Sequence, residues 1–295
     1  MRLSGQHDQT DMAPSLAGVD RPSQSISYTQ TRSENVSDAV LREKRIVTAM
    51  GHDGPYVDAY KMLRTRVRQQ LREKHWNTLA VTSSGDSEGK TLTAINLAIS
   101  LAGEVDHTVL LVDADLRHPR VHTYFGIPNG RGLSDYLTGD VPVQDMLFNP
   151  AGINGFVVLP GGRALPNSSE MLNSPKMVRL VEELKSRYSS RIVIFDLPPL
   201  LTAADALSFA PYVDAALLVV EEGKTQAEEM RYAAELLTKT NLIGTVLNKS
   251  LDRPRSYGMD GDAAPAALSI AKDRIGGFAR RLFRRKTLRP AGPAR

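Results

Sequence analysis

A stretch with the composition of a phosphate-binding loop follows a short apolar run early in the chain. The run 78–84 leads into a glycine-containing segment, and a helical apolar pattern begins directly after that segment. Backbone N–H groups at a helix N-terminus bind phosphate, a lysine offsets the charge of the terminal phosphates, and a threonine hydroxyl ligates Mg²⁺. This combination predicts nucleotide binding, although Ser84 stands where the usual eight-residue pattern has its first glycine. The predicted nucleotide-binding residues of the loop are Gly85, Asp86, Ser87, Glu88, Gly89, Lys90, Thr91 and Leu92.

Three aspartates lie at the ends of two later apolar runs. Asp113 and Asp115 end one run, and Asp196 follows the sequence IVIF in another. Side chains two apart on a strand share a side, and the carboxyl ends of parallel strands line the crevice where such sheets bind ligands. Three carboxylates near a lysine and a threonine would form a Mg²⁺ site suited to phosphoryl transfer. The alternative for each aspartate is a cap on the turn that follows it.

The elements that must position these residues are strands and helices in alternation. Short apolar runs bounded by Gly, Pro and Asp indicate strands buried on both faces, with helices between them. The predicted fold is therefore α/β, a mostly parallel sheet flanked by helices on both faces, as in phosphate-loop nucleotide-hydrolysing proteins. The expected strands are 78–84, 108–115, 155–162, 191–199, 214–222 and 243–250, and the expected helices are 56–71, 90–102, 168–187, 202–210 and 225–240.

Composition divides the 295 residues into three parts. Residues 1–52 are expected to be a largely disordered arm, because polar residues dominate their first two thirds. Residues 53–252 contain the catalytic domain, and residues 253–295 are expected to be a flexible basic tail. Cysteine is absent, which excludes disulfide scaffolds, thiolate zinc sites and cysteine nucleophiles.

Charge and hydropathy bear on location and partners. Residues 272–295 hold nine Lys/Arg and one acid, which leaves 28 basic and 32 acidic residues in 1–271. The net negative charge of residues 1–271 argues against nucleic-acid binding by this part of the chain. No run approaches the roughly 20 apolar residues of a membrane span, and no secretory signal is evident, so a cytoplasmic protein is expected. The segment IGGFARRLFRRKTL could place the tail on an anionic membrane surface, and a disordered basic tail is the equal alternative.

Four stretches resemble the bacterial tyrosine autokinases of capsule and exopolysaccharide export, a branch of the deviant-Walker ATPases. The resemblance covers about residues 56–250 and is more specific than the phosphate loop alone. The lysine that partition ATPases usually carry early in this loop does not occur in 83–88. The four stretches are LLVDADLRHPRVH (110–122), PNSSEMLNSPKM (166–177), IVIFDLPP (192–199) and VDAALLVVEEGKT (213–225).

The resemblance implies ATP and Mg²⁺ as cofactors and gives the site residues their roles. Lys90 would contact the β- and γ-phosphates, and Thr91 would ligate Mg²⁺. Asp113 and Asp115 would act at the metal and at the acceptor hydroxyl, and Asp196 would support the metal shell through water. A carboxylate within reach of a tyrosine hydroxyl, whose pKa is about 10, could accept its proton.

Two further assignments follow from the same resemblance. Asn248 would lie near the adenine edge, with a turn-forming asparagine as the alternative. In the helix before the first strand, the family uses a Glu-x-x-Arg-x-x-Arg pattern for subunit contacts in a ring. Asp58, Lys61 and Arg64 stand at these positions here. Because lysine cannot reproduce bidentate arginine geometry, a weaker homo-oligomeric ring or a plain solvated face is expected.

The family typically ends in a cluster of tyrosines that subunits phosphorylate in one another. Here Tyr257 is the single tyrosine after residue 250, and it is the expected autophosphorylation site, with Tyr28 in the N-terminal arm as its competitor. The tyrosines in patterned segments are expected to have packed or partly packed rings: Tyr124, Tyr136, Tyr188, Tyr212 and Tyr232.

The function expected from these residues is an ATP-dependent protein-tyrosine kinase at the inner face of the plasma membrane, activated by a separate membrane polysaccharide co-polymerase. The first alternative is an ATPase switch that hydrolyses ATP without phosphorylating tyrosine, which the sparse tyrosines favour. The second alternative is a scaffold that binds nucleotide without turning it over. Lys90, Thr91, Asp113 and Asp196 argue against the scaffold.

Overall fold

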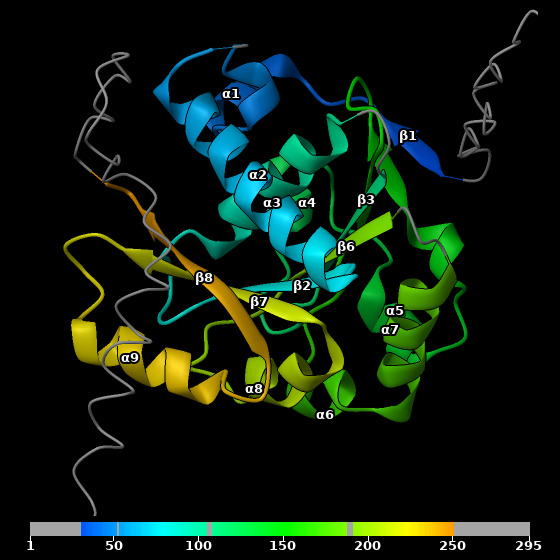
Figure 1. Ribbon diagram of the computed structural model, residues 1–295. Helices are drawn as coiled ribbons and strands as arrows, with labels where there is room; N and C mark the ends of the chain where they lie inside the picture. The colour runs from blue at the N-terminus through cyan, green and yellow to red at the C-terminus, as the bar shows by residue number, and fades with distance from the viewer. Residues whose placement is uncertain (1–30, 52, 105–107, 188–190, 251–295) are drawn as a thin grey trace, which may run out of the picture.

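The computed structural model describes residues 31–51, 53–104, 108–187 and 191–250, and in this part the chain forms one eight-stranded sheet with helices on both faces (Figure 1). The strand order is β1-β4-β5-β3-β6-β2-β7-β8, and every neighbouring pair is parallel except β4 and β5. The expected α/β fold is confirmed. The strands are Arg32–Glu34 (β1), Thr78–Ser83 (β2), Thr108–Asp113 (β3), Phe148–Pro150 (β4), Phe156–Leu159 (β5), Arg191–Asp196 (β6), Ala215–Glu221 (β7) and Asn241–Asn248 (β8).

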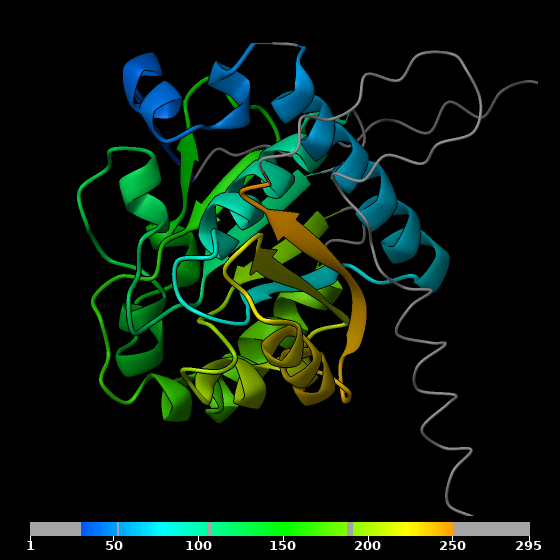
Figure 2. The same cartoon turned by 90° about the vertical axis from the view of Figure 1, so that its left-hand side faces the viewer.

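Helices cover the sheet in two layers, as Figures 1 and 2 show from two sides. The helices α1 to α4 pack on one face, and α5 to α9 pack on the other, each layer with its own apolar core. The central strands are therefore buried on both faces, which explains their unbroken apolar runs. The helices are Asp38–Glu43 (α1), Pro55–Lys74 (α2), Lys90–Ala102 (α3), Val121–Tyr124 (α4), Leu133–Thr138 (α5), Ser168–Leu172 (α6), Pro175–Arg187 (α7), Asp205–Phe209 (α8) and Ala227–Leu236 (α9).

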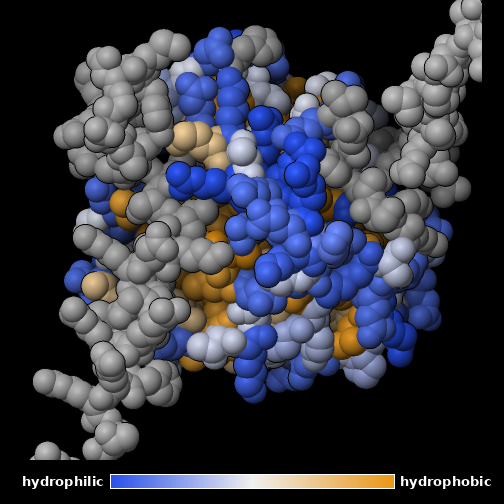
Figure 3. Space-filling view, in the orientation of Figure 1, coloured by the Kyte–Doolittle hydropathy of each residue, from blue (hydrophilic) through white to orange (hydrophobic). Residues whose placement is uncertain are grey.

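Helix α2 contains the expected helix 56–71 and extends it at both ends. Pro55 occupies the first turn, where its missing N–H costs no hydrogen bond, and His75 ends the helix in a left-handed conformation with φ 56°. The apolar stripe packs against α3, while the opposite face forms the hydrophilic band across the middle of Figure 3. Apolar atoms gather beside this band, over the region of β7 and β8. The buried residues of α2 are Val57, Tyr60, Leu63, Val67 and Leu71.

The structure differs from the expectation of a largely disordered arm over residues 31–51. Strand β1 pairs with β4 at the edge of the sheet, and Leu41 and Ile46 are buried. Val47 N–H donates to Asn96 Oδ1 of α3 at 2.9 Å. These short elements are fixed by tertiary contacts, which a local apolar period does not reveal.

Other differences concern the connections. The expected helix 168–187 is divided into α6 and α7 at Asn173 and Ser174, and Ser174 Oγ accepts the N–H of Met177 at 3.2 Å in the first turn of α7. The ring of Tyr232 was expected to pack, but it lies on the outer side of α9 and is 55% exposed. None of the helices in the described ranges is long and apolar enough to cross a membrane.

Candidate active site

The phosphate loop connects β2 to α3, as the sequence predicts, and its conformation depends on unusual backbone angles. Ser87 has φ 62° and Gly89 has φ 93°, both in the left-handed region. A Cβ atom at residue 89 would lie 2.0 Å from Asn248 Nδ2, so both the conformation and the close approach require glycine. Lys90 is the first residue of α3, and the unsatisfied N–H groups of that helix begin at the loop.

Side chains from the loop and from two strand ends converge at the start of α3. Lys90 Nζ lies 2.8 Å from Asp115 Oδ2 and 3.5 Å from Asp196 Oδ1. Thr91 Oγ1 donates to Asp196 Oδ2 at 2.7 Å. Burial opposes the charge of Lys90, but Asp196 and Asp115 outweigh it and raise the pKa of the ammonium. The lysine is therefore charged at neutral pH.

Asp113 lies next to Asp196 across the β3–β6 pair but faces the start of α4. Its Oδ2 atom accepts the N–H groups of Arg120 and Val121, each at 2.9 Å, while Oδ1 is buried without a partner in the described ranges. Burial raises the pKa of Asp113 to about 8, and Asp196 adds to that effect. The side chain is thus a buried carboxyl group with one unsatisfied oxygen. Within the described ranges no lysine or arginine side chain makes a hydrogen bond to Asp113.

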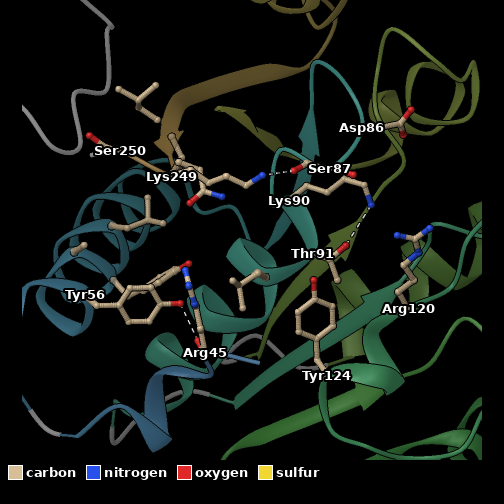
Figure 4. Close-up of a pocket in the computed structure, with 18 of the residues that line it drawn as sticks. Arg45, Tyr56, Asp86, Ser87, Lys90, Thr91, Arg120, Tyr124, Lys249 and Ser250 are labelled. Atoms are coloured by element: carbon tan, nitrogen blue, oxygen red, sulfur yellow. Dashed lines mark hydrogen bonds between the residues drawn. The ribbon is translucent and has the colours of Figure 1, made fainter. Parts of the chain in front are cut away.

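A cavity of about 890 Å³ opens in front of this cluster, a size typical of small-molecule sites (Figure 4). Lys90, Thr91 and Asp115 form its polar end, and Tyr124 points its hydroxyl group toward Thr91. Apolar residues of α2 and β8 form the opposite wall, among them Leu63. The cavity therefore combines a cationic, N–H-rich end with an apolar end, as a nucleoside phosphate requires.

Two of the predicted nucleotide-binding residues make side-chain hydrogen bonds within the protein. The carboxylate of Glu88 is 2% exposed, accepts Gly85 N–H at 3.0 Å, and also accepts the hydroxyl of Thr225. Asn248 Nδ2 donates to the carbonyl oxygen of Glu88 at 2.8 Å, so the predicted contact of Asn248 with adenine stays a prediction.

A buried network behind the Asp115 loop was not predicted from the sequence. Arg117 Nε donates to Asp205 Oδ2 at 2.9 Å, and Ser168 Oγ donates to the other carboxylate oxygen. Asp205 is completely buried. The network joins two of the stretches that carried the family resemblance to the start of α8. Asp205 lies in the sequence TAADALS, a plain helix start that gave no signal of this contact.

The predicted subunit-contact residues lie on α2 as expected, but they are engaged within the chain. Lys61 Nζ lies 3.3 Å from both Asp58 and Asp53. Arg64 Nε lies 3.2 Å from Glu104 Oε1, and its Nη1 donates to a carbonyl of α3 at 3.2 Å. Ring contacts by these residues stay a prediction, and Tyr257, Tyr28 and the basic tail lie outside the described residues.

The fold and the loop define the class of this protein: a phosphate-loop nucleotide-binding protein with a mostly parallel sheet. Its structure resembles the kinase domain of the Escherichia coli tyrosine kinase ETK, with a TM-score of 0.62 and 30% identity over 77% of this chain and 93% of that domain. It also resembles the septum site-determining protein MinD of Pyrococcus horikoshii, solved with Mg-ADP, with a TM-score of 0.50 and 23% identity, a likeness of fold. No family profile matches the chain.

Curated relatives give the family. Tyrosine-protein kinase YwqD of Bacillus subtilis (strain 168) is 35% identical over 207 residues, which cover 69% of this chain and 86% of that protein. Tyrosine-protein kinase etk of Escherichia coli (strain K12) is 34% identical over 199 residues, 67% of this chain but 27% of that longer protein. This chain belongs to the family of bacterial tyrosine-protein kinases, as the sequence motifs predict.

Proposed function

We propose that this chain is an ATP- and Mg²⁺-dependent protein-tyrosine kinase that phosphorylates itself. We further propose that it works with a membrane polysaccharide co-polymerase in exopolysaccharide polymerisation or export, at the cytoplasmic face of the plasma membrane. Family membership supports the reaction class. The observation that carries the site is the convergence of Lys90, Thr91 and Asp115 at the polar end of the cavity. Asp196 is buried behind them, in contact with Lys90 and Thr91.

The oxygen atoms at this end fit Mg²⁺ bound together with a nucleotide. In the described residues no group of three or more carboxylates or imidazoles could hold a metal ion alone. Mg²⁺ in kinases instead takes one or two protein oxygens together with phosphate oxygens and water. Thr91, Asp113 and Asp196 would hold the ion, which would supply charge neutralisation between the phosphates. Thr91 contacts Asp196, and Asp113 is the strand neighbour of Asp196 and has one oxygen without a partner in the described ranges.

The ion pair between Lys90 and Asp115 suggests how the two residues share the reaction. The ammonium of Lys90 would leave Asp115 and contact the transferred phosphoryl group, where its charge offsets the charge that develops there. This exchange frees the carboxylate of Asp115 to accept the proton of the tyrosine hydroxyl. Both residues are largely buried, with side-chain exposures of 12% and 8%, so their electrostatic interactions are weakly screened.

The test is to incubate the purified chain with ATP and Mg²⁺ and to map phosphotyrosine by mass spectrometry. Lys90→Met should reduce phosphotyrosine formation by about 100-fold or more, because it removes a charge that acts on the transition state. Near-normal formation in that variant would overturn the site assignment. The sparse tyrosines favour one alternative, an ATPase switch, which would release phosphate in the same assay without forming phosphotyrosine.

A further inference from the structure

Two lysines bind the backbone of the phosphate loop, Lys224 from outside the cavity and Lys249 from its wall. Lys224 Nζ, in the turn after β7, donates to the carbonyl oxygen of Asp86 at 2.6 Å. Lys249 Nζ, directly after β8, donates to the carbonyl oxygen of Ser87 at 2.8 Å, the contact drawn in Figure 4. Neither lysine was singled out in the sequence as a site residue. Charge-assisted bonds of this kind are stronger than bonds between neutral groups.

The next carbonyl groups of the loop are held in the same way. The carbonyl oxygen of Glu88 accepts Asn248 Nδ2 at 2.8 Å, and that of Gly89 accepts the N–H of Thr93 at 2.9 Å. Four consecutive carbonyl groups, 86–89, are therefore bound by protein donors.

These carbonyl contacts determine where the loop N–H groups point. In a planar trans peptide the C=O group and the following N–H group point in opposite directions. Carbonyl groups held by the two lysines thus fix the direction of the following N–H groups, in a loop whose residues Ser87, Gly89 and Lys90 line the cavity. Within the described part of the chain, the N–H groups of 87–89 donate to no protein acceptor. A row of free N–H groups is an anion-binding cradle.

One carboxylate holds both lysines in place. Glu221, the last residue of β7, lies 2.9 Å from Lys249 Nζ and 3.5 Å from Lys224 Nζ. The same turn also anchors the loop from inside, because the hydroxyl of Thr225 donates to the buried carboxylate of Glu88. The two lysine side chains are 47% and 51% exposed, so they contribute little to the packed core.

We propose that Lys224 and Lys249, held by Glu221, are positioning residues that orient the peptide groups of the phosphate loop for nucleotide binding. The inference rests on the proposed function, in which this loop binds ATP. Without the two ammonium groups the carbonyls of Asp86 and Ser87 would turn to other donors, and the N–H groups that follow them would leave the cradle.

The test compares a double variant, Lys224→Met with Lys249→Met, with the matched control Lys239→Met, which removes an exposed lysine just beyond α9. Calorimetry should show that the double variant binds ATP and ADP at least about tenfold more weakly, as expected when charge-assisted bonds are lost, while the control stays within about twofold of the parent chain. The melting temperature of the nucleotide-free protein should not change. Replacing both lysines with arginine keeps donors at these positions and should restore most of the affinity.

Further readouts separate this role from others. Hydrogen exchange of the amides at 86–90 in the ATP-bound state should be faster in the double variant than in the parent chain. Double-variant affinity equal to the control would overturn the inference, and so would a loss confined to ATP, which would indicate direct contact with the γ-phosphate. A parent chain that binds no ATP would overturn the proposed function as well. Phosphotyrosine formation that needs Lys90 but not the two lysines would overturn this inference alone.

Discussion

At the scale of single residues, the end of strand β3 buries the carboxyl group of Asp113 beside the proposed Mg²⁺ site, where its ionised form is unfavourable. Strands β3 and β6 are apolar and parallel, so their carboxyl ends place Asp113 and Asp196 side by side at the edge of the sheet. Two N–H groups stabilise one oxygen of Asp113, but burial and the neighbouring carboxylate outweigh them and raise its pKa to about 8. A cation bound nearby would reverse this effect, which is consistent with the proposed Mg²⁺ site.

A pH-dependent stability follows from that pKa. Between its ordinary value, near pH 4, and about pH 8, Asp113 is protonated in the folded protein and ionised in the unfolded chain. The folded state binds more protons there, so this group lowers the free energy of unfolding by up to about 1.4 kcal/mol for each pH unit of increase. Asp113→Asn stays uncharged and keeps an acceptor for the two N–H groups, so the variant should gain stability relative to the parent between pH 5 and pH 8.

Urea unfolding at several pH values, without nucleotide or Mg²⁺, measures this difference. Other titrating groups are shared by the two proteins, so the difference between their curves reports Asp113. Parallel curves across this pH range would show that the carboxyl group is ionised in the folded chain.

At the scale of elements, the sequence predicts the strands and helices whose apolar residues recur with a regular period. It misses the short elements that only tertiary contacts hold in place. Strands β2, β3, β5, β6, β7 and β8 and helix α3 were predicted because their apolar runs have strand or helix periods. The edge pair β1 and β4 was missed, because each is three residues long and is held by its partner. In the site, residue type and spacing identified Lys90, Thr91 and Asp196. The lysines that bind the loop carbonyls lie about 140 to 160 residues away in sequence, so folding alone brings them to the loop.

The network of Arg117, Asp205 and Ser168 allows a prediction about how elements are joined. Arg117→Ala would leave the buried carboxylate of Asp205 with the Ser168 hydroxyl as its remaining partner among the contacts described. An unsatisfied buried acceptor costs about 1–3 kcal/mol, so the free energy of unfolding should fall by that amount. Phosphotyrosine formation should fall as well, because Arg117 lies two residues after Asp115 and holds that loop.

Chemical denaturation of Arg117→Ala, with Arg231→Ala as the control, measures the effect. Arg231 pairs with Glu235 at 3.2 Å on the exposed face of α9, and an exposed pair of this spacing contributes only about 0.3–0.5 kcal/mol. Equal losses in the two variants would show that the buried network adds no stability of its own.

At the scale of the whole molecule, the described part of the chain ends at the cavity. Ser250, the last described residue, lines the cavity, and Tyr257 follows seven residues later. Seven residues span at most about 25 Å, so the chain length between Ser250 and Tyr257 permits a tyrosine to reach the cavity of its own subunit. The family resemblance favours transfer between subunits.

We predict that Tyr257 is the chief autophosphorylation site and is phosphorylated by a second subunit. In the described part of the chain the competing acceptors are limited by burial: Tyr60 is 8% exposed, whereas Tyr232, at 55%, is an accessible competitor that the sequence did not reveal. A phosphate on Tyr257 adds about −1.5 to −2 charges beside Arg253 and Arg255, a pairing that would hold the segment away from a neighbour's cavity.

The measurement mixes active Tyr257→Phe protein with inactive Lys90→Met protein that keeps Tyr257, and mass spectrometry assigns each phosphotyrosine to its subunit. Label on Tyr257 of the inactive subunit is the expected result, because that subunit cannot phosphorylate itself. Label on Tyr257 in the unmixed parent chain but not in the mixture would mean transfer within one subunit. Label at Tyr28 or Tyr232 instead would move the acceptor to the arm or to α9. A Tyr232→Phe variant of the inactive subunit is the matched control, and it should accept label at Tyr257 as well as its parent does.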